Sequence, residues 1–232
     1  MIAVPRPLVA LVGSPNTGKT TLFNALTGMR ARTANYSGTT VEMKLGLLEL
    51  GARMVELVDL PGVYSLTAAT ADEQVTADVL AGRNRGIGRP DLAVVLADAN
   101  NLERSLFVVS QLIERELPVV VALNLVDLAA RHGIVVDPAG LSRELGCPVI
   151  PTVACDGRGV DELKSAIAES LNRKPEERIA IAPPSGCGGC SGCPFQARYN
   201  WSDRVTAACV KAPRVAKDRK TDKLDAWLTH PV

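Results

Sequence analysis

An α/β fold, in which a mostly parallel sheet of about six or seven strands is flanked by helices, is predicted by two features of the sequence. Residues 8–172 alternate short apolar runs with amphipathic segments, the order typical of strands followed by crossover helices. Two of the runs, LAVVLAD at 92–98 and LPVVVALN at 117–124, are apolar on both faces. These two strands therefore belong in the buried centre of the sheet.

The first two elements follow from the same pattern and from a glycine at the helix end. PLVALVG at 7–13 is the expected first strand, and KTTLFNALTG at 19–28 is the helix after it, ended by Gly28 as a C-terminal cap. The other expected elements are strands at 44–50 and 54–60 joined as a hairpin through residues 51–53, a short strand within 146–151, and an amphipathic helix at 160–172.

The composition changes after the last of these helices. Residues 173–197 combine four prolines with the run GCGGCSGC, which is typical of a linker. Residues 198–232 hold two segments with helical spacing, too short to form a core of their own. We therefore expect one domain at 1–172, a linker at 173–197 and a short helical appendage at 198–232.

Length and charge set limits on the function. The 232 residues carry a net charge of +1, and Trp, Tyr and Phe together make only 3% of the chain, so neither a basic surface nor stacking platforms for nucleic acid are expected. No apolar run reaches the roughly 20 residues that span a bilayer, and the N-terminus lacks the pattern of a signal peptide. A cytoplasmic location follows as an expectation.

The segment GSPNTGKTT predicts a phosphate-binding loop. Gly13, Gly18, Lys19 and Thr20 have the spacing of that motif and lie between an expected strand and an expected helix. Glycines let backbone N–H groups turn towards phosphates at the helix N-terminus. Lys19 would reach the β- and γ-phosphates and the Thr20 hydroxyl would bind Mg²⁺. The alternative is a chance glycine-rich turn before a helix.

A second motif, DLPG at 59–62, ends the strand expected at 54–60. Asp59 can hold Mg²⁺ through water, and the Gly62 N–H can reach the γ-phosphate. Taken alone, DLPG is a common ending of a strand. Its position after the phosphate loop favours the roles in binding Mg²⁺ and the γ-phosphate.

A third motif, NLVD at 124–127, predicts which base is bound. The Asp127 carboxylate can accept from N1–H and the 2-amino group of guanine, and adenine offers neither group. Asn124 would contact the ring edge and the phosphate loop. After the next strand, the Ala154 backbone N–H would donate to the guanine oxygen, with Val153 beside it. The sequence therefore favours guanine.

These motifs, in this order, resemble a Ras-type GTPase domain. The run NYSGTTVE at 35–42, the long match PNTGKTTLFNALTG and DLPGVYSL narrow the resemblance to the cytosolic GTPase domain of the bacterial ferrous iron transporter family FeoB. It covers residues 8–172 well and the tail more weakly. It implies a nucleotide site made of Gly13, Asn16, Thr17, Gly18, Lys19, Thr20, Thr21, Asn124, Asp127, Val153 and Ala154.

The resemblance also implies a setting. The chain is similar to the N-terminal piece of an inner-membrane Fe²⁺ transporter, whose own transmembrane domain would be its partner. A small cytosolic accessory protein and a homo-oligomer in the membrane are further implied partners, and nucleic acid is not. GTP and GDP would be substrate and product, with Mg²⁺ and K⁺ as cofactors.

Two positions depart from the common pattern. Leu125 stands where the guanine motif usually has Lys, and Val153 stands where the following loop usually has Ser. The first change weakens packing over the base, and the second removes a hydroxyl that could brace the loop. Both favour modest affinity and fast release of GDP.

Hydrolysis needs a group to stabilise charge on the phosphates, and no Gln follows Gly62 where Ras has one. The two histidines, His132 and His230, lie outside the motifs. In potassium-activated GTPases the Asn that matches Asn16 binds K⁺ beside the phosphates, together with backbone carbonyls of the first switch, here residues 35–38. The alternative is that Asn16 only shapes the loop.

Thr40 aligns with the family threonine that completes the Mg²⁺ shell, although Thr39 beside it leaves the alignment open by one residue. The expected catalytic residues are therefore Asn16, Lys19, Thr40 and Gly62. The expected Mg²⁺ ligands are Thr20, Thr40 and Asp59.

Three cysteines stand outside the GTPase pattern. Cys187, Cys190 and Cys193 are spaced as Cys-x2-Cys-x2-Cys, and Cys209 is available as a fourth ligand. Such a set can hold Zn²⁺ or an iron–sulfur cluster, and the alternative is an unstructured glycine-rich loop.

Two other functions remain open from the sequence. A GTPase of RNA modification or ribosome assembly shares the Asn-bearing loop, but it would need a basic or RNA-binding module. A metal-sensing module that uses the cysteine cluster is the third possibility.

Overall fold

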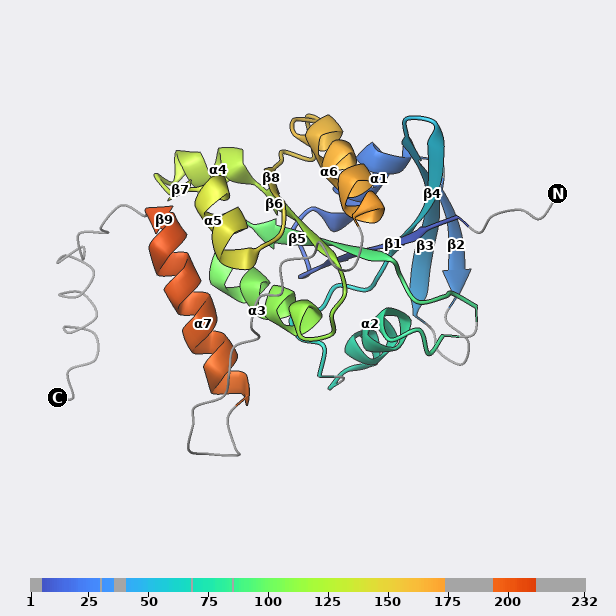
Figure 1. Cartoon of the computed structure of the whole chain (residues 1–232), viewed down its shortest axis with the longest axis horizontal. Helices are drawn as coiled ribbons and strands as arrows, with labels where there is room; N and C mark the ends of the chain where they lie inside the picture. The colour runs from blue at the N-terminus through green and yellow to red at the C-terminus, as the bar shows by residue number, and fades with distance from the viewer. Residues whose placement is uncertain are drawn as a thin grey trace, which may run out of the picture.

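A seven-stranded sheet forms the centre of the protein (Figure 1). Its strand order is β2-β3-β4-β1-β5-β6-β8, so β1 (Leu8–Gly13) lies in the middle. The computed structural model describes residues 6–29, 31–35, 41–67, 69–84, 86–173 and 194–211.

Most strand pairs of the sheet are parallel. β1 pairs in parallel with β4 (Arg53–Asp59) and β5 (Leu92–Asp98), and β6 (Val119–Asn124) pairs in parallel with β5 and β8 (Val149–Pro151). The exceptions involve β3 (Glu42–Leu50), which is antiparallel to β4 and to the edge strand β2 (Ala31–Asn35). The predicted architecture of a mostly parallel sheet is confirmed.

Helices cover both faces of the sheet because side chains alternate along each strand. On β1, Val9 and Leu11 join the core with α1 (Lys19–Thr27) and α6 (Val160–Asn172). Ala10 and Val12 join the opposite core. The helices packed in that second core are α2 (Ala71–Leu80), α3 (Leu102–Ile113), α4 (Val126–Arg131), α5 (Pro138–Leu145) and α7 (Pro194–Cys209).

Several expected elements are present with nearly the expected bounds. α1 ends at Gly28, whose φ of 60° is the left-handed conformation that glycine adopts without strain. β3 and β4 form the expected hairpin, and α6 spans the residues predicted for it. β5 and β6 are buried almost throughout, as their apolar composition predicted.

Other elements were not expected from the sequence. β2 has the sequence ARTAN, which has no apolar alternation, and it is held at the sheet edge by backbone pairing with β3. β7 (Val135–Val136) and β9 (Val210–Lys211) form a separate two-stranded sheet. α4 (Val126–Arg131) lies directly before β7, so the end of α7 is tied to the segment that follows α4.

α7 packs as part of the domain core. It begins at Pro194, within the stretch 173–197 for which a linker was expected, and its Trp201 and Val205 are buried in the core that also contains α3 and α5. The two residues are four apart, so they lie on one face of the helix. Within the described residues, no helix is both long and apolar enough to cross a membrane.

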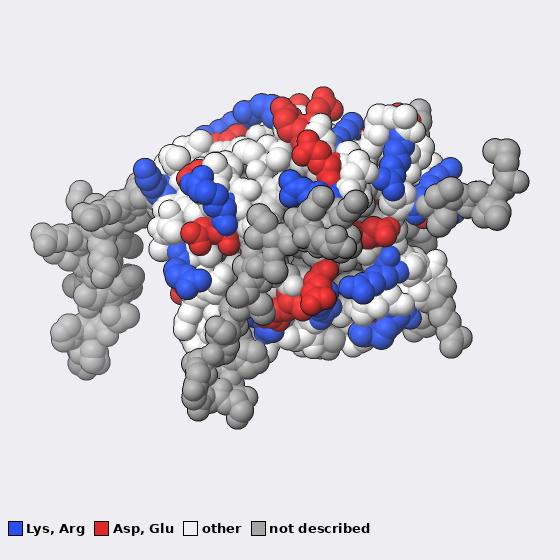
Figure 2. All heavy atoms as spheres, in the orientation of Figure 1, with Lys and Arg blue, Asp and Glu red and all other residues white. Residues whose placement is uncertain are grey.

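Charged side chains of both signs are interspersed on the described surface seen in Figure 2. The chain as a whole carries 26 basic and 25 acidic residues. The overall charge of the chain therefore favours neither anionic nor cationic ligands.

Candidate functional site

The loop between β1 and α1 has the geometry of an anion-binding site. β1 ends at Gly13 and α1 begins at Lys19, with Gly18 at its N-cap in a left-handed conformation (φ 87°). Asn16 also has a positive φ, 66°. The exposed residues Thr20 and Thr21 lie in the first turn of α1. The free N–H groups of this helix end are therefore presented beside the loop.

The loop is held from inside. The Thr17 hydroxyl donates to the Ser14 carbonyl over 2.8 Å, and the Asn124 side chain donates to the Thr17 carbonyl over 2.8 Å. A Cβ on Gly18 would lie 2.6 Å from Nδ2 of Asn124. Gly18 is therefore required twice, for its backbone conformation and for the close approach of Asn124.

Lys19 and Asp59 form an ion pair beside the loop. Asp59 ends β4 and pairs in register with Leu11 of β1, so the parallel sheet itself brings this carboxylate next to the phosphate loop. Both side chains are largely buried, with 13% and 7% of their surface exposed. A hydroxyl at Thr20 and a carboxylate at Asp59 are oxygen ligands of the kind that Mg²⁺ prefers, so the residues present fit this ion.

Gly62 lies against the same loop. The Val63 N–H donates to the Gly13 carbonyl over 3.0 Å. A Cβ on Gly62 would approach Pro15 to 3.1 Å. The segment after β4 is thus anchored to the phosphate loop at the residue that follows Gly62.

Asn124 connects the loop to the end of β8. Its Oδ1 accepts from the Ala154 N–H over 3.0 Å and from the Thr152 hydroxyl over 3.3 Å. The Ala154 N–H is the donor expected at the guanine oxygen, so base binding requires this N–H to be shared or to leave Asn124. Val153, next to it, is buried and its N–H donates to the Arg158 carbonyl.

Thr152 was not singled out from the sequence. The expectation was that Val153 deprives the loop of a bracing hydroxyl, and the structure places a hydroxyl on the preceding residue, where it bonds to Asn124. A threonine directly after a short strand is the available sequence signal, but it carries no information about its distance from Asn124.

Leu125 and Asp127 lie at the start of α4. Leu125 is the N-cap residue with a left-handed φ of 62°, and Asp127 lies in the first turn. Both are half-buried. Because Asn124 ends β6 and Asp127 follows within one helical turn, the two side chains belong to one corner of the molecule.

Some expected site residues lie outside the described residues: Thr40, Cys187, Cys190 and Cys193. Cys209, the suggested fourth cysteine ligand, is described and is buried in the core, where burial raises the pKa of its thiol. In the part of the chain that the structure describes, no three His, Cys, Asp or Glu side chains gather in a way that would hold a metal ion.

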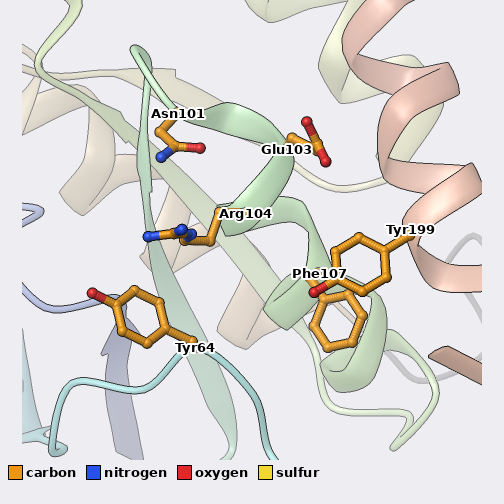
Figure 3. A pocket seen from close by; sticks show the side chains of 6 residues that line it. All are labelled: Tyr64, Asn101, Glu103, Arg104, Phe107 and Tyr199. Atoms are coloured by element: carbon orange, nitrogen blue, oxygen red, sulfur yellow. The ribbon is translucent and has the colours of Figure 1, made fainter. Parts of the chain in front are cut away.

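Apart from the phosphate loop, a pocket of about 530 Å³ lies next to the segment after Gly62 (Figure 3). Tyr64 of that segment lies under the guanidinium of Arg104 on α3, 5.0 Å from ring to charge. On the other side, Tyr199 of α7 packs against Phe107 of α3, with the ring centroids 4.9 Å apart. Desolvation and the neighbouring Asp203 carboxyl raise the pKa of Glu103 at this junction.

Comparison with known families and proteins gives one consistent result. Residues 8–167 match the family described as ferrous iron transport protein B. The Fe(2+) transporter FeoB of Escherichia coli K12 is 43% identical over 180 residues, and that of Salmonella typhimurium LT2 is 45% identical over 180 residues. In both cases the match covers 76% of this chain and only 23% of the relative.

Solved structures agree with the sequence comparison. The cytosolic domain of L. pneumophila FeoB is 31% identical with a TM-score of 0.76, covering 88% of this chain and 99% of that one. The cytosolic domain of the T. maritima FeoB iron transporter in its GMPPNP form is 28% identical with a TM-score of 0.75, over 88% and 99% of the two chains. The G domain of T. maritima FeoB is 38% identical with a TM-score of 0.65, over 72% of this chain and 100% of that one.

Proposed function

The chain belongs to the family of ferrous iron transport protein B, and from this membership we propose that it binds and hydrolyses GTP in order to control Fe²⁺ transport. Because it spans 23% of the length of its relatives, the transport itself would be performed by a membrane part that lies outside this sequence. The domain would then act on the cytoplasmic side of the cell membrane.

The observation that carries this proposal is the convergence of three motifs on one loop. Lys19 lies in an ion pair with Asp59, the segment after Gly62 is anchored to Gly13, and Asn124 is bonded to Thr17. A chance glycine-rich turn would not be expected to collect all three partners. Relatives solved in GMPPNP and GDP forms support a guanine nucleotide as the ligand.

Each residue has a defined task in this proposal. The N-terminal end of α1 at Gly18 and Lys19 would receive the phosphates, because the backbone N–H groups of a helix N-terminus attract anions and the Lys19 ammonium would join them. Lys19 would exchange Asp59 for phosphate oxygens when the nucleotide binds. Asp127 would accept from N1–H and the 2-amino group of guanine, which selects guanine over adenine.

Thr20, Thr40 and Asp59 would hold Mg²⁺, which supplies positive charge against the β- and γ-phosphate oxygens. Gly62 would offer its N–H to the γ-phosphate. Release of Thr40 after hydrolysis would convert the chemical step into a change of loop conformation. That change is the signal that would reach the membrane part.

Asn16 would hold K⁺ beside the phosphates, and the charge of that ion would stabilise the negative charge that develops there. The alternative is that Asn16 only shapes the loop. The Asn16 φ of 66° supports that alternative, because Asn tolerates the left-handed region better than most other residues with a side chain. Asn16→Ala would therefore remove a carboxamide and also strain the backbone. Asn16→Gly removes the carboxamide and relieves the backbone, so it is the sharper variant.

The test is the steady-state rate of GTP hydrolysis in KCl and in NaCl at equal ionic strength. We expect the wild-type chain to be at least about tenfold faster in KCl, a difference of about 1.4 kcal/mol in activation free energy. Asn16→Gly should lose this difference while its GDP affinity changes little. A K⁺ stimulation that survives in Asn16→Gly would leave Asn16 as a residue that only shapes the loop.

A further inference from the structure

Gln111 of α3 and Arg115, two residues beyond the end of α3, hold the segment after Gly62. Oε1 of Gln111 accepts from the Leu66 N–H over 2.7 Å, and Nη2 of Arg115 donates to the Leu66 carbonyl over 3.0 Å. Both backbone groups of one loop residue are therefore bound by side chains that lie 45 and 49 residues further along the chain.

This attachment is buried and reinforced. Gln111 is only 4% exposed, and its Nε2 also donates to the Ser65 hydroxyl over 3.2 Å. The side chain of Leu66 is itself part of the core. A buried backbone N–H that loses its acceptor is energetically costly, so the contact between Leu66 and Gln111 is favoured over an unpaired Leu66 N–H.

The other end of the segment is fixed at the phosphate loop. The Val63 N–H donates to Gly13, and Gly62 packs against Pro15. The chain between Val63 and Leu66 is therefore tied at both ends, and Tyr64 between them lies against Arg104 of α3 (Figure 3). Little conformational freedom remains for Gly62, whose position decides whether its N–H meets a γ-phosphate.

We infer that Gln111 is a positioning residue for hydrolysis, assisted by Arg115, and that it acts by holding the segment 63–66 so that Gly62 faces the phosphate loop. This inference rests on the proposed function. A group held in place before the reaction does not have to be ordered during it, and catalysis depends strongly on such placement. Gln111 would act through the two residues that it contacts in this segment, Ser65 and Leu66.

A purely structural role makes a different prediction. If Gln111 only joins α3 to its neighbours, its loss should lower stability and leave the kcat of the remaining folded protein unchanged. If it positions Gly62, its loss should lower kcat for GTP while the affinity for GDP, which lacks the γ-phosphate, stays nearly constant.

The experiment compares four chains: wild type, Gln111→Leu, Gln111→Glu and Ser110→Ala. Gln111→Leu keeps the size and removes the acceptor, whereas Gln111→Glu keeps an oxygen that can accept from Leu66. Ser110 is the matched control, because it is buried on the same helix and its hydroxyl donates to Phe107 within α3. For each chain, kcat and KM for GTP, Kd for GDP and the thermal midpoint are measured.

We expect Gln111→Leu to lower kcat about tenfold or more with Kd for GDP within about twofold, and Gln111→Glu to recover most of the rate. Ser110→Ala should keep kcat. Unchanged kcat in Gln111→Leu, or an equal loss in Ser110→Ala, would overturn the inference alone. A wild-type chain that binds GTP without hydrolysing it would overturn the proposed function as well, so the two failures are distinguishable.

Discussion

Asn124 joins two loops of the site through one carboxamide. Its Nδ2 donates to Thr17 in the phosphate loop, and its Oδ1 accepts from Thr152 and Ala154 at the end of β8. The side chain is 1% exposed, so each of these bonds is made away from water. Buried polar groups that are hydrogen-bonded fix the geometry around them, and here they fix the phosphate loop relative to the end of β8, where we propose that the base binds.

The Thr152 hydroxyl should therefore contribute to nucleotide retention. Thr152→Val keeps the shape of the side chain and removes one bond to Asn124, worth about 1 kcal/mol, so GDP should dissociate about fivefold faster. Thr152→Ser keeps the hydroxyl and should dissociate GDP at nearly the wild-type rate. Stopped-flow release of a fluorescent GDP measures both. Equal GDP dissociation rates in Thr152→Val and wild type would show that the hydrogen bond from Thr152 to Asn124 does not contribute to nucleotide retention.

At the residue scale, a contact can be predicted when both of its residues belong to recognisable motifs. The meeting of Lys19 with Asp59 could be anticipated, because Lys19 belongs to the loop motif that follows β1 and Asp59 ends β4, the parallel neighbour of β1. The contacts of Thr152 with Asn124 and of Gln111 with Leu66 could not, because neither Thr152 nor Gln111 belongs to a motif that would point to its partner. A single sequence contains no local signal for such pairs.

At the element scale, α7 is attached to the domain by a stripe of buried residues and a polar rim. Trp201, Val205 and Cys209 follow one another at intervals of four and are all buried. Arg198 adds an ion pair with Glu114 of α3, with Nη2 and Oε2 2.6 Å apart. The apolar stripe should carry most of the stability, since such a pair at the rim is worth little.

Trp201→Ala should accordingly lower the free energy of unfolding by about 3–5 kcal/mol, the usual cost of removing a large buried aromatic side chain. Phe195 is the comparison, because it lies on the same helix but is 46% exposed. Phe195→Ala should cost about 1 kcal/mol or less. Urea unfolding followed by circular dichroism gives both values. Similar losses in the two variants would mean that α7 is held by its exposed rather than its buried face.

The elements that could be predicted are those whose composition alone determines their place. β5 and β6 are apolar on both faces and lie inside the sheet, and α1 ends at the one residue type that adopts its capping conformation readily. β2 is polar and its pairing uses only the backbone, which leaves no side-chain pattern to detect. β7 and β9 are two residues each, and they pair because α7 packs on the domain and places β9 beside β7.

At the scale of the whole molecule, the candidate site lies where the carboxyl ends of parallel strands meet. Gly13, Asp59 and Asn124 end β1, β4 and β6, which are parallel members of one sheet. Ligands of open α/β sheets bind at this edge. Both cores are built on these strands.

α7 is tied to that site twice. It packs against α3, which holds the segment after Gly62, and its end pairs through β9 with β7, directly after α4. The Asp137 N–H also donates to the Cys209 carbonyl over 2.8 Å. The chain continues from β9 towards residues 212–232, so any signal passed along the sequence must first cross α7.

A guanine nucleotide should therefore stabilise α7 although it does not touch it. Saturation at about 100 times Kd stabilises the folded domain by about 2.7 kcal/mol, and amides that open only in global unfolding share this gain. We expect GDP with Mg²⁺ to slow hydrogen exchange in both α1 and α7, and ATP to slow neither. Protection of α1 with unchanged exchange in α7 would instead show that α7 opens independently of the nucleotide-binding core. In that case its buried stripe would be too weak to link the site to the residues beyond it.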